Sequence, residues 1–173
     1  MTGLKNNGLY IRFLSLFPII LLYLSILNNF DFNYLGLKYF SFNFSYIIIF
    51  YYSLKKSHSL GYVYIFVAGL FNDVIIGMPI GISSLIYLLL CGAAAYLRNI
   101  TLRPSLQKDW IFFLVTILIL NSLSFIILTL IFEYSVNYLD QLINIFFTFL
   151  FYFIFSHLFD YIEATFLGKS NAR

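Results

Sequence analysis

The chain has 173 residues, of which 62% are hydrophobic and 10% are charged, and its net charge is +3. A soluble domain carries roughly 45–50% apolar and about 25% charged residues, so a water-soluble fold is excluded because its interior could not hold this much apolar surface. The Lys and Arg residues lie in short stretches between apolar runs and form no basic face, which argues against nucleic-acid binding. The composition therefore predicts one all-α integral membrane domain over residues 1–173, surrounded by membrane lipid.

Six apolar segments predict a bundle of about six transmembrane helices, because each crossing needs roughly 20 residues. In chain order they cover residues 13–30, 35–54, 60–76, 80–97, 110–132 and 141–159. The first lacks a small-residue cleavage site after it, so we expect a retained helix and not a signal peptide. The second is placed from Leu35 with Lys38 snorkelling outward. The Gly77-Met78-Pro79 sequence separates the third segment from the fourth.

The distribution of Lys and Arg predicts the orientation of these segments in the membrane. With six spans, one side receives nine basic residues and the other side receives only Lys38. The nine are Lys5, Arg12, Lys55, Lys56, Arg98, Arg103, Lys108, Lys169 and Arg173. Because cytoplasmic loops carry the excess of Lys and Arg, both termini are predicted to lie in the cytoplasm.

Asp73 is the only acidic residue inside one of these apolar segments. A carboxylate at the bilayer centre costs roughly 2.5–3.5 kcal/mol on insertion scales, but Asp73 lies only one helical turn before Gly77, near the outer end. Gly69 and Asn72 share its helix face and form a small, polar stripe that allows another helix to approach closely. Two interpretations remain open. Asp73 braces the turn that runs to Gly81, or it contacts a partner or a ligand.

Polar residues also mark one face of the later segments. Ser83, Ser84 and the small residues near Cys91 indicate helix packing in the fourth segment, and Asn121 lies at the middle of the fifth. In the sixth, polar residues recur every three or four positions, at Gln141, Asn144, Thr148, Tyr152 and Ser156. We expect the last two faces to meet inside the bundle, either in hydrogen bonds between helices or around a small polar cavity.

No set of residues predicts catalysis. Gly81, Ser83 and His157 resemble the serine and base of rhomboid-type proteases, but their predicted depths differ by roughly 25 Å at about 1.5 Å per residue. A nucleophile and its base must lie about 3 Å apart. The sequence also lacks His, Cys and Glu at metal-ligand spacing. It therefore predicts no catalytic residue, cofactor or metal.

The segment from Gly69 to Leu85 resembles the MreD family of bacterial rod-shape-determining membrane proteins. The glycines and the aspartate recur every four residues as in the family pattern, and a proline stands between the second and third glycine. The following segment, which ends at Arg98, also fits. The candidate structural or partner-binding residues are Gly69, Asn72, Asp73, Gly77, Pro79 and Gly81.

The resemblance implies a helical bundle similar to the substrate-binding subunits of energy-coupling-factor transporters. It further implies a non-enzymatic scaffold in the bacterial inner membrane that acts with an MreC-like protein in peptidoglycan synthesis. The same cell-elongation machinery includes MreB filaments, the RodA glycosyltransferase and a class B penicillin-binding protein. The alternative is a vitamin-binding subunit of an energy-coupling-factor-type transporter, which would need a defined outer pocket, whereas the single Trp110 lies at the inner end of its segment.

Overall fold

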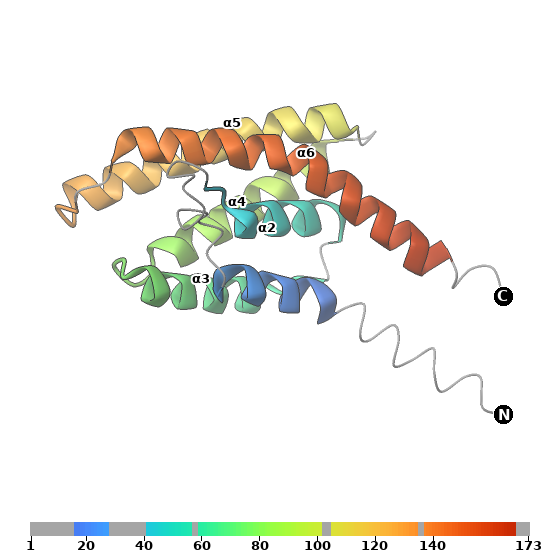
Figure 1. The fold of residues 1–173 in the computed structure, drawn as a ribbon, viewed down its shortest axis with the longest axis horizontal. Coiled ribbons are helices and arrows are strands. Elements are labelled where there is room, and N and C mark those ends of the chain that lie inside the picture. Colours follow the sequence, from blue (N-terminus) through green and yellow to red (C-terminus); the bar gives the residue numbers. More distant parts are fainter. Residues whose placement is uncertain (1–15, 28–40, 57–58, 102–104, 135–136, 169–173) are drawn as a thin grey trace, which may run out of the picture.

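The computed structural model describes residues 16–27, 41–56, 59–101, 105–134 and 137–168. Within these ranges the chain forms helices and no strand, which confirms the all-α prediction. The helices are Leu16–Leu27, α2 (Phe44–Lys55), α3 (Tyr62–Ile76), α4 (Ile82–Ile100), α5 (Leu106–Leu130) and α6 (Tyr138–Gly168) (Figure 1).

The helix ends gather at two ends of the bundle. The last residues of α2 and α4 and the first residues of α5 meet at what we name the basic end, which carries Lys55, Lys56, Arg98 and Lys108. The C-terminal half of α6 runs to this end, on the right in Figure 1. The turn end holds the α3–α4 turn, the end of α5 and the start of α6. Of the other residues used for the orientation, Lys5, Arg12, Lys38, Arg103, Lys169 and Arg173 lie outside the described residues.

Helix α2 is the core of the bundle, because every residue from Ser45 to Leu54 is buried. A helix that is buried all round is surrounded by other helices and not by lipid. Its start differs from the prediction: the helix begins at Phe44 and not near Leu35, and residues 35–40 lie outside the described part. The backbone N–H of Asn43 donates to Thr148 Oγ1 of α6 at 2.8 Å, so the chain is fastened to α6 before it becomes helical.

Within the part of the chain that the structure describes, three helices are long and apolar enough to cross a membrane, namely α4, α5 and α6. Leu16–Leu27 and α3 are apolar but shorter, so six full spans remain a prediction. Helices α5 and α6 also extend past the predicted limits of 110 and 159. Those limits were set by the nearest charged residues, whereas a helix continues through charges that find water, lipid headgroups or a partner.

One face of α5 is apolar and uncovered. Ile111, Val115 and Ile119, spaced by four residues, are all exposed, and Ile126 and Leu130 follow farther along the helix. Soluble monomers rarely expose contiguous apolar patches of this kind, whereas lipid covers them in a membrane. The surface therefore agrees with the membrane location that composition predicts.

Candidate functional site

Asp73 is completely buried, and both oxygens of its carboxylate accept backbone hydrogen bonds. Oδ2 accepts from the N–H of Gly81 at 2.7 Å, and Oδ1 accepts from the N–H of Ser83 at 2.9 Å. The first N–H groups of a helix have no partner within the helix, and a negative charge at that end is favourable. Asp73 of α3 therefore caps the N-terminus of α4.

The turn between α3 and α4 depends on two glycines with positive φ. Gly77 has φ 73° and ends α3, and Gly81 has φ 106° and precedes α4. Residues with a side chain rarely adopt this backbone conformation. The N–H of Met78 donates to the Asp73 carbonyl at 3.0 Å and closes the end of α3. Pro79 lies half-buried between the glycines and restricts φ there.

Helices α3 and α4 touch along the stripe of small residues. A Cβ atom on Gly69 would lie only 2.4 Å from Ser84 Cα, so a side chain has no room. Ser84 Oγ donates to the carbonyl of Phe66 at 3.0 Å, and Asn72 Nδ2 donates to Ser83 Oγ at 2.8 Å. The structure thus brings the six candidate residues together: Gly69, Asn72 and Asp73 join the two helices, and Gly77, Pro79 and Gly81 shape the turn.

A polar cavity of about 380 Å³ lies beside this turn. Its polar lining includes Tyr46 from α2, Asn72 from α3, Ser83 from α4, Asn121 from α5, and Gln141 and Asn144 from α6. Gln141 Nε2 donates to the Asn121 carbonyl at 3.0 Å, so the two polar faces meet as expected. The buried Gln141 Oε1 has no hydrogen-bond partner among the described residues, so it is an unused acceptor beside the cavity.

The next polar residues of α6 contact Ser41 and Asn43, which the sequence analysis placed inside the second helical segment. Asn144 Nδ2 donates to Ser41 Oγ at 3.0 Å, and Thr148 accepts from the residue before α2. Tyr152 lies farther along α6, where its ring stacks on Phe113 of α5 with centroids 4.3 Å apart. The periodicity identified the buried face of α6, but it could not show that the entry to α2 shares this face with α5.

Ser83 and His157 are engaged in separate hydrogen bonds. Ser83 Oγ accepts from Asn72 at the α3–α4 contact. His157 is exposed, and its Nδ1 lies 3.0 Å from the carbonyl of Phe153, one turn earlier in the same helix. The structure does not bring the two side chains together. In the described ranges, no group of three or more His, Cys, Asp or Glu side chains could hold a metal ion.

The acidic partners of the lysines at the basic end were missed by sequence reasoning. Lys55 Nζ lies 2.6 and 2.7 Å from the two carboxylate oxygens of Asp160, which also accepts from the Tyr51 hydroxyl at 2.8 Å. Lys56 Nζ lies 3.0 Å from Glu163 Oε1. Because Asp160 and Glu163 are three residues apart, they share one helix face. That spacing was a signal in the sequence for the docking of α2 against α6.

These features define a helical membrane protein whose buried polar groups mainly fasten one helix to another. The family described as "rod shape-determining protein MreD" matches residues 10–162 of the 173-residue chain, and the chain belongs to this family. The chain matches no curated protein and no solved structure. Family membership gives it a role as a rod-shape-determining membrane protein, while the similarity to energy-coupling-factor subunits stays a prediction.

Proposed function

We propose that this protein is a non-enzymatic scaffold of the cell-elongation machinery, which holds an MreC-like protein in the bacterial inner membrane and so supports peptidoglycan synthesis. The family match over residues 10–162 carries the proposal. The geometry supports it, because the residues of the family-like segment are used in packing and backbone hydrogen bonds between α3 and α4. Residues used in this way are suited to holding two helices in a fixed arrangement, and not to carrying out a chemical step. In this proposal both termini lie in the cytoplasm, so alkaline phosphatase fused after Arg173 is expected to be inactive.

The contact with the partner is proposed to lie on the outside of the turn. Both oxygens of Asp73 accept backbone N–H groups and the side chain is completely buried, so its surface offers no contact to a partner. Ile80, in contrast, is 73% exposed at the tip of the turn. We therefore assign the apolar turn surface around Ile80 to the membrane-embedded part of the MreC-like protein. MreB, RodA and the class B penicillin-binding protein would join through that partner.

Co-purification tests this proposal. The tagged full chain is extracted in mild detergent from a rod-shaped cell, and the recovered MreC-like protein is quantified against an unrelated multi-span bait of equal abundance. We expect strong enrichment with the wild type and a several-fold loss with Ile80→Ser. Ile119→Ser is the matched control, because Ile119 is 61% exposed on α5, away from the turn. Absence of enrichment with the wild type would refute the scaffold proposal.

The polar cavity supports a second candidate, a vitamin-binding subunit of an energy-coupling-factor-type transporter. Its volume of about 380 Å³ falls within the roughly 300–1,000 Å³ of small-molecule sites, and Gln141 Oε1 offers an unused acceptor. Under this alternative the same purification would recover an energy-coupling module in place of an MreC-like protein. The purified protein would also retain a vitamin detectable by mass spectrometry.

A further inference from the structure

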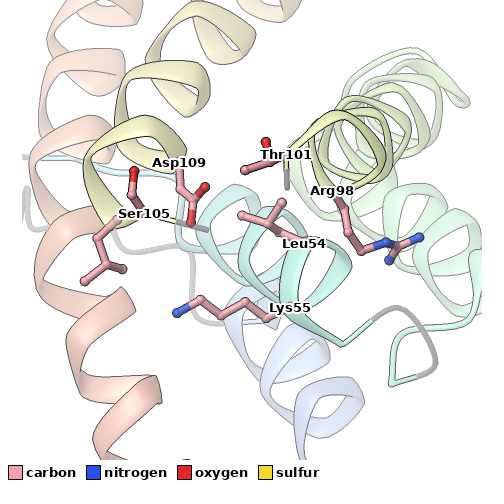
Figure 2. Close-up of a pocket in the computed structure, with 7 residues that line it drawn as sticks. Leu54, Lys55, Arg98, Thr101, Ser105 and Asp109 are labelled. Atoms are coloured by element: carbon pink, nitrogen blue, oxygen red, sulfur yellow. The ribbon is translucent and has the colours of Figure 1, made fainter. Parts of the chain in front are cut away.

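A second pocket, of about 520 Å³, lies at the basic end between α2, α4 and α5. Leu54 and Lys55 come from the end of α2, Arg98 and Thr101 from the end of α4, and Ser105 and Asp109 from the start of α5 (Figure 2). All of these residues lie at helix ends, where a membrane bundle meets the lipid headgroups. The pocket is separate from the polar cavity at the turn end, with which it shares no lining residue.

Asp109 is the unusual member of this pocket. Its side chain is only 3% exposed, and no hydrogen bond or ion pair joins its carboxylate to another described residue, although Lys55 of the same pocket is near enough to attract it electrostatically. Its place in the first turn of α5 favours a negative charge but supplies no donor. A buried charge without a partner is costly. Figure 2 shows the carboxylate directed from α5 into the space beside Leu54, where a ligand with a donor group could reach it.

The two cations of the pocket are already oriented by the protein. Lys55 Nζ contacts Asp160, and Arg98 Nη1 donates to the Ser53 carbonyl at 2.9 Å. An ammonium group has three donors and a guanidinium has five, so both keep donors for an anion. Figure 2 shows these two cationic groups on either side of Leu54. The pocket therefore offers positive groups at its sides and one buried negative group.

We propose that this pocket binds the headgroup of an ethanolamine phospholipid. The phosphate contacts Lys55, whose ammonium group lies on the same side of Leu54 as Asp109. The ammonium group of the lipid donates to the Asp109 carboxylate, while Arg98 adds positive charge on the other side of Leu54. Basic pockets between transmembrane helices are known to bind phospholipid headgroups, and a headgroup with its own ammonium also matches the buried acid. The Leu54 side chain contacts the apolar part of the lipid. This site is independent of the proposed scaffold role, so either can fail without the other.

Binding of matched lipids to the purified, delipidated full chain tests the proposal by native mass spectrometry. Phosphatidylcholine is the control lipid, because it has the same phosphate and positive charge but no N–H donor. We expect roughly tenfold tighter binding of phosphatidylethanolamine, the size of one hydrogen bond to a charged group. Asp109→Asn should lower this ratio several-fold, because a neutral amide oxygen accepts a weaker hydrogen bond than a carboxylate. Arg98→Gln should weaken both lipids, and Lys108→Gln, an exposed charge outside the pocket, should change neither.

Three results with the matched lipids would overturn the proposal, and the first two need no variant. One is equal binding of the ethanolamine and choline lipids by the wild type. Another is tighter binding of phosphatidylglycerol, which would mean that an anionic headgroup is preferred. The last is an unchanged lipid ratio in Asp109→Asn. Soluble phosphoethanolamine is the competing source of the same chemistry; if it competes as well as the lipid, the ligand is a free phosphate ester and the lipid assignment is wrong.

Discussion

Two aspartates are buried in the described part of the chain, one at each end of the bundle, and their surroundings are opposite. Asp73 is fully buried and accepts two backbone N–H groups from the start of α4. Asp109 is 3% exposed and accepts none from the described residues. The cost of burying a carboxylate depends on whether donors surround it. The comparison shows that Asp73 stabilises the fold, whereas under our proposal Asp109 receives the headgroup of a bound lipid.

Of the changes near Asp73, we expect the largest loss of folded protein from one that separates α3 from α4. Gly69→Leu puts a side chain where even a Cβ would be 2.4 Å from Ser84 Cα. Overpacking costs about 1–3 kcal/mol even where neighbours can shift, and here the neighbour is backbone. We expect most of the folded protein to be lost in detergent gel filtration. Gly92→Leu is the control, because a Cβ at Gly92 meets nothing within 4 Å.

Asp73→Asn should have the next largest effect. An amide can replace one acceptor oxygen, but its NH₂ group would then face the backbone N–H of Gly81 or Ser83. The unsatisfied groups should cost about 1–3 kcal/mol, seen as a lower thermal unfolding midpoint. Asp140→Asn provides the comparison, because Asp140 is an exposed acid in the first turn of α6. Equal midpoints for wild type and Asp73→Asn would show that the cap contributes nothing.

Asp109→Leu tests whether the second buried aspartate contributes to stability as Asp73 does. Since the Asp109 carboxylate has no hydrogen bond to another described residue to lose, an apolar side chain of similar shape should change the unfolding midpoint only slightly in lipid-free detergent, by no more than the roughly 0.3–1 kcal/mol of a first-turn charge. Asp73→Leu should lower the midpoint sharply under the same conditions. If both variants were destabilised equally, Asp109 would be a structural residue like Asp73, and its assignment to a ligand would be wrong.

The smallest effects are expected from two side chains that do not themselves bond either aspartate carboxylate, namely those of His157 and Ser83. His157 is exposed and bonded only within its own helix, so His157→Ala should leave cell shape and protein amount unchanged. Ser83→Ala removes the hydroxyl that Asn72 contacts, at a cost of about 1 kcal/mol, and should also support normal shape. Loss of function in both variants at normal protein levels would instead point to a nucleophile and its base.

The contrast between the two aspartates also explains what the sequence could predict. Asp73 drew attention because it interrupts an apolar segment, and the glycines after it predicted a turn that it could brace. Asp109 directly precedes the segment predicted from Trp110, so it resembled an ordinary flanking acid. Hydropathy identifies the segments that can be buried in a membrane, but it contains no information on which side chains contact one another. For the same reason it missed the contact of Lys55 with Asp160 and the late start of α2.

The central claim, that this chain determines rod shape as a scaffold, is tested most directly by complementation. The wild-type chain is expressed, together with its own MreC-like partner, in a rod-shaped cell depleted of its MreD-family protein, and the ratio of cell length to width is measured. The account predicts that rods return with the wild type and with Ser83→Ala, and that cells stay round with Gly69→Leu. Round cells that contain abundant, folded wild-type protein would contradict it.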